Sequence, residues 1–219
     1  MHGGHGLKKA GPMLAAVIAT AIMAGGPVRA ERGAVAHSLT TVALRVPATA
    51  RPSSERVLTN AFTTGYTWFD NTPRGSAQIS APVLHRSAGG TGTYADPITL
   101  AVGHSNASGV DVLDFAAGTR FYLPHVRRYF IVEDSCGDGP RPQNTGCHRL
   151  TTAPAGAKVW VDLYVGGGPA DKATAVQACA STVTDGDAAL HRLIVNPHPN
   201  HLVVAGALFA HGRCTQLFR

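Results

Sequence analysis

Short runs of β-branched and aromatic residues, each closed by Gly, Pro or Asp, most constrain what this chain can fold into. Three of them lie in the middle of the chain, over residues 121–123, 129–132 and 159–165. Runs of this length and composition are typical of β-strands. Three acidic residues punctuate this region, namely Asp114, Asp134 and Asp162. Carboxylates at strand ends of a small β-barrel can converge on one groove, which suits general acid chemistry on a polysaccharide.

Similar runs extend over much of the remaining chain. Residues 61–70 and 78–87 are predicted strands, and the continuous apolar run over residues 98–103 predicts a buried strand. Residues 191–195 and 201–209 flank a Pro-rich stretch, which predicts a β-hairpin.

One segment reads as a helix. Residues 170–180 contain good helix formers, and Asp171 lies in the expected first turn, where a carboxylate interacts well with the helix dipole. Many short strands, frequent Gly and Pro and one short helix indicate a mainly-β fold, built as a barrel.

The start of the chain is typical of a secretory signal peptide. Lysines precede an uncharged apolar run over residues 13–24, and small residues stand before position 31. We therefore expect a signal peptide over residues 1–30, a flexible leader over residues 31–56 and one domain over residues 57–219. The expected location is secreted or periplasmic, with no membrane association once the signal has been cleaved.

The charge of the chain argues against nucleic acid as a partner. The formal net charge is +6 at pH 7, and removing residues 1–30, which hold three basic residues and no acid, leaves +3. Nucleic-acid binders usually cluster Lys and Arg, but beyond the signal the only tight pair is Arg127-Arg128. A mildly basic monomer suits loose attraction to an anionic cell wall or glycan.

The four cysteines predict two disulfides, because an even number in an exported chain favours pairing. Cys136–Cys147 would close a Gly- and Pro-rich loop, and Cys179–Cys214 would tie the helix to the C-terminal region. Other pairings of four cysteines remain open. The spacing of Cys and His fits no zinc motif, so neither a metal nor a cofactor is expected.

Asp162 is the strongest candidate for a functional residue. Strand periodicity puts Trp160, Asp162 and Tyr164 on one face, while Val161 and Leu163 face the core. An acid flanked by aromatic rings is a plausible sugar subsite, and partly apolar surroundings raise a carboxyl pKa, as a general acid near neutral pH needs. The alternative is an Asp that satisfies turn amides or pairs with an Arg.

The other acidic residues receive separate roles. Asp70 is the candidate for a second carboxylate, because glycoside hydrolysis commonly uses two. Asp114 and Asp134 are expected to be structural, since Asp134 precedes a turn-like Ser-Cys-Gly, where Asp commonly caps backbone amides. Glu133 is adjacent to Asp134 on a strand and therefore points to the opposite face.

The stretch AAGTRFYLPHVRRYFIVEDSCG, followed by VWVDLYVGG, resembles the three-aspartate (3D) domain of bacterial cell-wall proteins. That family is grouped with MltA-type lytic transglycosylases, RlpA-like proteins, expansins, barwins and family 45 endoglucanases. The resemblance implies a six-stranded double-psi β-barrel. It also implies that Asp162 matches the catalytic acid of the transglycosylases and Asp134 the aspartate of a Glu-Asp-Thr-Gly motif. Thr67-Trp68-Phe69-Asp70 is similar to the first strand of expansin barrels, where cellulases of the group carry a second Asp.

These features predict a secreted protein that binds or cleaves cell-wall polysaccharide, either peptidoglycan or a plant or fungal glycan. In the enzyme version, a hydrolase or a lytic transglycosylase, Asp162 is the general acid and Asp70 positions water or stabilises charge. In the binding version, an expansin- or barwin-like module stacks sugars on its aromatic residues, Trp160, Tyr164, Trp68 and Tyr66. A third version is a secreted inhibitor or effector that uses the barrel only as a scaffold.

Overall fold

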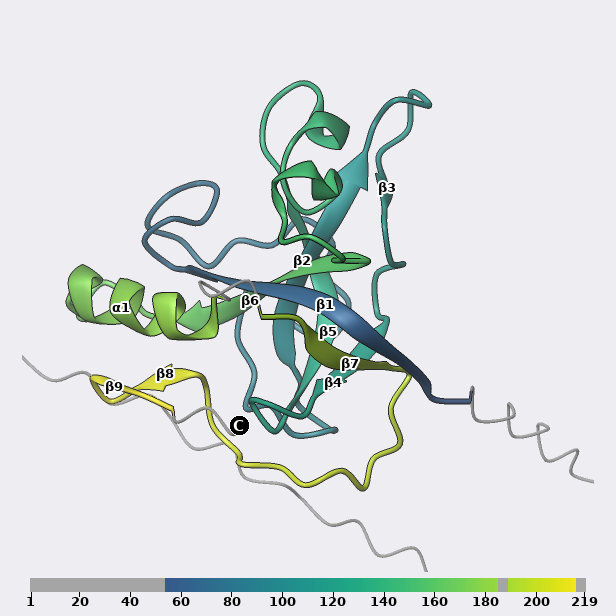
Figure 1. Ribbon diagram of the computed structural model, residues 1–219. Coiled ribbons are helices and arrows are strands. Elements are labelled where there is room, and N and C mark those ends of the chain that lie inside the picture. Colours follow the sequence, from purple (N-terminus) through teal and green to yellow (C-terminus); the bar gives the residue numbers. More distant parts are fainter. Residues whose placement is uncertain (1–53, 185–188, 216–219) are drawn as a thin grey trace, which may run out of the picture. The chain divides into compact units, whose positions relative to one another are not determined.

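In the computed structural model of the chain, β-strands pair both with neighbours in the sequence and with strands far along the chain (Figure 1). It describes residues 54–184 and 189–215, all of which belong to one compact unit, Ala50–Arg219. The expected signal peptide, residues 1–30, and residues 31–53 of the expected leader lie outside the described residues. No helix in the described part of the chain is long and apolar enough to span a membrane.

The described residues form a mainly-β structure with one α-helix, as predicted. The elements in chain order are β1 (Arg56–Thr67), β2 (Ile98–Ser105), β3 (Val112–Leu113), β4 (Arg120–Leu123), β5 (Arg128–Cys136), two 3-10 helices (Pro142–Asn144 and Leu150–Thr152), β6 (Val159–Gly166), α1 (Ala173–Val183), β7 (His191–Val195), β8 (Phe209–Ala210) and β9 (Arg213–Cys214). Arg56, placed in the leader by the sequence, already belongs to β1.

Seven of the described strands form one sheet in the order β3-β2-β5-β4-β7-β1-β6, and β8 and β9 pair separately. Strand β1 runs parallel to β6 and antiparallel to β7, while β2 runs parallel to β5. An additional antiparallel pairing of β2 with β6 joins the two sides of the sheet. The pairings therefore close a ring through β2, β5, β4, β7, β1 and β6.

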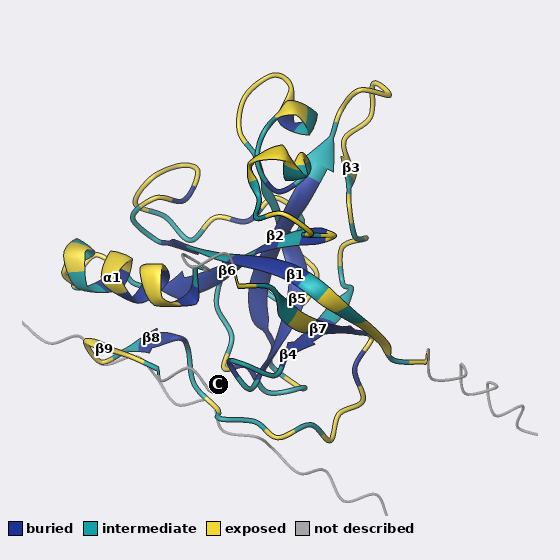
Figure 2. Cartoon of the chain, viewed as in Figure 1, coloured by how far each residue is buried: buried dark blue, intermediate teal, exposed yellow. Residues whose placement is uncertain are grey.

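The core lies inside this ring and extends under the helix (Figure 2). Val161 and Leu163 of β6 are fully buried, as the period-2 pattern predicts. Helix α1 buries one face, formed by Val176, Cys179, Ala180 and Val183. Gly65 of β1 allows the close approach, because a Cβ there would lie 2.6 Å from a methyl carbon of Val183. The expected helix is thus present, but it begins at Ala173, so Asp171 lies before its first turn.

The predicted strand over residues 78–87 is wrong, because this segment gives most of its N–H groups to side chains and makes one backbone bond to a strand, from Ala81 N to Glu133 O of β5. Glu133 Oε1 accepts hydrogen bonds from the backbone N–H groups of Val83, Leu84 and His85 at 3.2, 2.5 and 2.8 Å. Its Oε2 accepts a bond from His85 Nδ1 at 2.6 Å, and His85 Nε2 lies 2.9 Å from Asp96 Oδ1. We call Glu133, His85 and Asp96 the loop clasp, since they hold residues 83–96 against β5.

The predicted hairpin over residues 191–195 and 201–209 is also wrong. Strand β7 pairs with β1 and β4, not with the segment that follows the Pro-rich turn. That returning segment is bound to other loops, because Val204 N donates to Arg127 O and Gly206 N donates to Thr91 O. It forms a strand only from Phe209, which pairs with Cys214.

Candidate functional site

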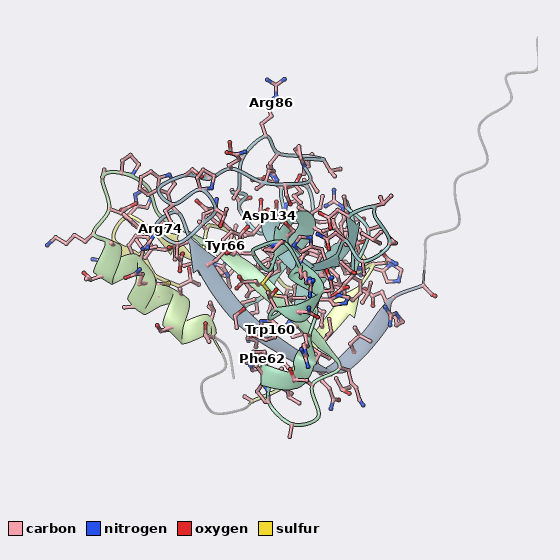
Figure 3. The ribbon with its side chains drawn as sticks, turned by 90° about the horizontal axis from the view of Figure 1, so that it is seen from above. Phe62, Tyr66, Arg74, Arg86, Asp134 and Trp160 are labelled. Atoms are coloured by element: carbon pink, nitrogen blue, oxygen red, sulfur yellow. A yellow bond between two sulfur atoms is a disulfide. The ribbon has the colours of Figure 1, made fainter. Side chains whose placement is uncertain are left out.

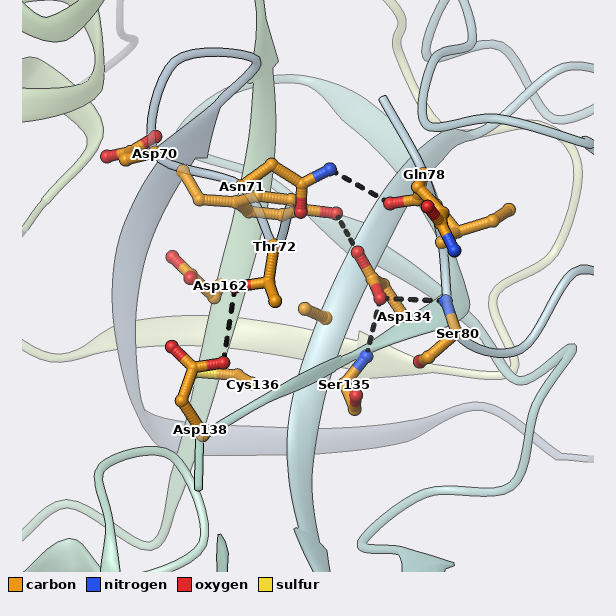
Figure 4. Close-up of a pocket in the computed structure, with 14 residues that line it drawn as sticks. Asp70, Asn71, Thr72, Gln78, Ser80, Asp134, Ser135, Cys136, Asp138 and Asp162 are labelled. Carbon is orange, nitrogen blue, oxygen red and sulfur yellow. Dashed lines mark hydrogen bonds between the residues drawn. The ribbon is translucent and has the colours of Figure 1, made fainter. Parts of the chain in front are cut away.

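A pocket of about 280 Å³ opens where β1, β5 and β6 meet the loops that follow β1 and β5 (Figure 4). Its most conspicuous lining side chains are four carboxylates, Asp70, Asp134, Asp138 and Asp162. None of its lining residues, all of which lie in the described part of the chain, is a Lys, Arg or His. The pocket therefore concentrates negative charge and carboxyl groups in a small volume.

Asp162 enters the pocket from β6, where it pairs in register with Thr64 of β1 and Ala101 of β2. Its Oδ1 accepts a hydrogen bond from Thr64 Oγ1 at 2.7 Å. The pKa of this carboxyl is raised to about 7, chiefly by burial and to a smaller degree by the charges of Asp70 and Asp134, against the lowering effect of the Thr64 bond. Asp162 thus retains a proton at pH values where free Asp is ionised.

Asp70 lies just beyond the end of β1, on the lining of the same pocket. Its Oδ1 accepts bonds from the backbone N–H and the hydroxyl of Thr67 at 2.7 and 2.6 Å. This turn fixes one carboxylate oxygen and leaves the exposed Asp70 side chain at the solvent side of the pocket. The structure therefore brings together Asp162 and Asp70, the two predicted carboxylates.

Asp134 is fully engaged by protein donors. Its Oδ1 accepts bonds from the backbone N–H groups of Ser80 and Ser135 at 3.0 and 2.9 Å, and its Oδ2 accepts the hydroxyl of Tyr66 at 3.0 Å. It lies within β5, as expected, one residue past an irregularity that leaves Glu133 without a partner in β2, but the strand continues to Cys136, where a turn was expected. The contacts support the predicted structural role of Asp134.

Asp138 and the loop after β1 were not singled out by the sequence. Thr72 Oγ1 donates to Asp138 Oδ1 at 3.2 Å and so links two walls of the pocket. The Asn71 side chain donates to the carbonyls of Ser76 and Gln78 at 3.0 and 2.9 Å, which shapes the loop between them. The signal that could have found Asp138 is its place inside the Cys136–Cys147 loop, directly after β5.

The four predicted stacking residues do not form one surface. Tyr66 lines the pocket but is buried, and its pKa is raised well above the usual range by burial and by Asp134 and Asp162, so it stays a hydroxyl donor (Figure 3). Tyr164 is buried against Tyr66, with ring centroids 5.3 Å apart. Trp68 contacts Phe69 instead, and Trp160 contacts Phe62.

Trp160 and Asp114 line a second pocket of about 450 Å³. Asp114 Oδ1 lies 2.7 Å from His148 Nδ1, so this carboxylate is part of a pair with His148. Phe115 adds a half-buried aromatic side chain to the wall. Within the described residues, no three His, Cys, Asp or Glu side chains come together as a metal-binding group.

Both predicted disulfides are confirmed. Cys136 is bonded to Cys147, and Cys179 of α1 is bonded to Cys214 of β9. The first bond closes the loop that supplies Gly137 and Asp138 to the Asp162 pocket. The second fixes α1 to the last described strand.

Comparison with known proteins points to a family. The chain is 45% identical over 73 residues to "Uncharacterized protein DDB_G0273701/DDB_G0273221" of Dictyostelium discoideum, an alignment that covers 33% of this chain and 28% of that relative. The chain thus matches less than a third of the relative's length. No solved structure matches the chain. Residues 58–215, which include every strand from β2 to β9 and nearly all of β1, match the model of the DDB_G0273701 N-terminal domain, and the chain belongs to that family.

Proposed function

We propose that this protein cleaves a cell-wall polysaccharide and that Asp162 is the general acid of the reaction. The observation that carries the proposal is the Asp162 carboxyl itself, which has a pKa of about 7 and lines a pocket with three further carboxylates. A general acid works best when its pKa lies near the operating pH, because it then holds a proton and can still release it. Free Asp does not meet this condition.

The second carboxylate would be Asp70. Asp162 donates its proton to the glycosidic oxygen as the bond from that oxygen to the anomeric carbon breaks. The positive charge that develops on the sugar ring is stabilised by the Asp70 carboxylate. In a hydrolase, water then adds to the anomeric carbon and passes its proton to a carboxylate of the site. In a lytic transglycosylase, a hydroxyl of the same sugar would instead bond to that carbon and pass its proton to a carboxylate of the site.

The fold supports the same proposal. The ring of six paired strands, with β1–β6 and β2–β5 as parallel pairs, is what a six-stranded double-psi β-barrel would require. We propose this barrel as the fold and place the protein with the 3D-domain, RlpA-like and expansin-like proteins that its sequence resembles. Two disulfides favour an oxidising compartment, so we propose that the protein acts after secretion.

The test is product release from insoluble peptidoglycan, chitin and β-glucan, with products identified by mass. Hydrolysis adds one water to the products, whereas transglycosylation does not. We expect Asp162→Asn to reduce release by roughly 100-fold or more, since the amide has no proton to give. Asp114→Asn, in the second pocket, is the matched control and is expected to keep activity. Equal release by Asp162→Asn and the unmodified protein would refute the proposal.

A non-catalytic glycan-binding module is the second candidate, and the second pocket favours it. Trp160 and Phe115, both half-buried, line this larger pocket and offer ring surface for stacking. If the protein releases no product, retention on the same insoluble glycans is the deciding measurement. Loss of retention in Phe115→Ala, with unchanged retention in Asp162→Asn, would favour binding alone.

A further inference from the structure

A chain of hydrogen bonds connects the second pocket to Asp162. Trp160 Nε1 donates to Thr64 Oγ1 at 2.8 Å, and Thr64 Oγ1 donates to Asp162 Oδ1 at 2.7 Å. The three residues are neighbours on one face of the parallel pair β1–β6, in which Thr64 stands opposite Asp162 and Trp160 lies two residues before it. The indole therefore reaches the carboxyl through one hydroxyl.

The direction of these bonds follows from the donors involved. An indole N–H can only donate, so the Thr64 oxygen accepts it, and Thr64 has a single hydrogen left to give. Among the described residues, the only acceptor within reach of that hydrogen is Asp162 Oδ1. Asp162 Oδ1 therefore accepts the Thr64 hydrogen bond whether the Asp162 carboxyl is protonated or ionised. The acid proton must sit on Oδ2, the oxygen that no described residue holds by a hydrogen bond.

The indole itself lies close to two other residues. Its ring lies edge-on to Phe62, with centroids 4.8 Å apart, and Figure 3 shows the two side chains together. The indole also lies close to Gly146, where a Cβ would approach the indole Cη2 to 2.9 Å. Gly146 belongs to the loop closed by the Cys136–Cys147 bond. The disulfide loop thus limits where the indole N–H can point.

We propose that Trp160 is a positioning residue for Asp162, and that it acts through Thr64 to keep the acid proton on Oδ2, ready for a ligand in the pocket. The inference rests on the proposed role of Asp162 as the acid. It adds that Trp160 acts on the reaction without touching the substrate. It also explains why an aromatic residue outside the pocket has a polar atom directed at the β1–β6 pair.

The experiment titrates the Asp162 carboxyl by ¹³C NMR in the folded, full chain without glycan. Thr64→Val removes the donor, so the carboxylate loses a bond and the Asp162 pKa is expected to rise by roughly 1 unit. Trp160→Phe keeps an aromatic ring but removes the N–H that donates to Thr64. The Thr64 hydroxyl is then free to accept a bond from the protonated acid, so the Asp162 pKa is expected to rise by a smaller amount. Thr64→Ser restores the hydroxyl and is expected to return the pKa to that of the unmodified protein.

Phe62→Leu is the control, because Phe62 packs on the indole and takes no part in the hydrogen bonds. It is expected to lower the melting temperature without moving the Asp162 pKa. A Trp160→Phe shift no larger than that of Phe62→Leu would overturn the proposal. The titration needs no substrate, so it decides the role of Trp160 even if no glycan is cleaved. If cleavage occurs, the alkaline limb of its pH profile is expected to move with the same pKa.

Discussion

Asp162 and Asp134 line one pocket but differ in the number of hydrogen bonds that their carboxyl groups accept. Asp134 accepts three hydrogen bonds, from Ser80, Ser135 and Tyr66. Asp162 accepts one, from Thr64, and feels the charges of Asp70 and Asp134. Donors stabilise an ionised carboxylate, while burial and like charges disfavour it. A proton shared within this pocket therefore belongs on Asp162.

This contrast predicts how stability depends on pH. The pKa of Asp162 is about 7 in the folded protein, against an ordinary value of 3.8. Between these values the folded state binds more protons than the unfolded state, so the free energy of unfolding falls as pH rises from about 4 to about 7. Asp162→Asn has the shape of the protonated acid and no charge. Its melting temperature is expected to match the unmodified protein at pH 4 and to exceed it at pH 8.

Thermal melts of both proteins across this range are the measurement, and Asp114→Asn serves as a control for the loss of one charge elsewhere. A difference in melting temperature between Asp162→Asn and the unmodified protein that stays constant from pH 4 to pH 8 would contradict the prediction.

At the scale of elements, the loop clasp predicts a second pH effect. Burial opposes the charged form of His85, but its bonds with Asp96 and Glu133 outweigh this and raise the His85 pKa. The stabilisation is therefore complete below the ordinary histidine pKa of 6.5 and is lost as pH rises through the higher folded value. His85→Ala is expected to cost about 2 kcal/mol of unfolding free energy at pH 6, since it removes the imidazole bonded to buried Glu133 Oε2 and leaves that oxygen with the Thr99 hydroxyl alone.

The cost of His85→Ala is expected to be smaller at pH 9, where the imidazole is neutral and no longer pairs with Asp96. Denaturant unfolding at both pH values measures this. Asp96→Asn is the matched control and is expected to remove most of the pH dependence while Glu133 stays paired. A cost that is equal at pH 6 and pH 9 would show that His85 acts only by packing.

The two disulfides are expected to contribute unequally, because their loops differ in length. The bonded cysteines are 11 and 35 residues apart in the sequence. Loop-closure entropy assigns about 3 kcal/mol to the shorter loop and about 4 kcal/mol to the longer one. Replacing each pair by Ser and measuring denaturant unfolding tests the order. A larger loss of unfolding free energy for the Cys136–Cys147 pair would mean that this disulfide stabilises the pocket by more than its effect on loop-closure entropy.

The sequence predicted well those elements whose signal is local. The alternation of Trp160, Val161, Asp162 and Leu163 places the acid on the correct face, because a strand repeats every two residues. The disulfides follow from four cysteines and a Gly- and Pro-rich loop between the first two. Asp70 and Asp162 line the same pocket, and their pairing was predicted from the chemistry of two carboxylates and from a family resemblance.

The structural features that could not be predicted from the sequence depend on hydrogen-bond partners far along the chain. Glu133 binds His85, 48 residues away, and no local pattern marks that pair. Buried Arg128 donates to Gly206 O and to Thr215, 78 and 87 residues away. These bonds also decide which segments are strands, since the amides taken by Glu133 are those of the segment wrongly predicted as a strand.

At the scale of the whole molecule, the pocket and the chain have opposite charges. The chain has a formal net charge of +6, or +3 once residues 1–30 are removed, but the pocket lining has four Asp and no basic residue. The basic surface favours approach to an anionic wall, while the pocket disfavours an acidic sugar within it. On the proposed function, we expect neutral or amine-bearing glycans such as chitin and partly deacetylated chitin to be cleaved in preference to polyuronates.

Release rates from partly deacetylated chitin and polygalacturonate, at low and high salt, test this preference. The difference in release rate between the two polymers is expected to shrink at high salt, because salt screens the negative charge of the pocket. Asp138→Asn, which removes one charge from the pocket wall without touching Asp162, is expected to reduce it as well. Equal rates on both polymers at low salt would contradict the prediction.

The pairing of β1 with β6 and β7 also sets when the protein can fold during synthesis. Ala61 pairs with Val159 and with His191, so the first strand must wait for residues made about a hundred or more positions later. At ribosomal speeds that interval is on the order of ten seconds, during which β1 has neither partner. A nascent chain that stalls before His191 lacks the strand that joins β1 to β4. Such a fragment is expected to expose two open strand edges and to be removed by proteases or to aggregate.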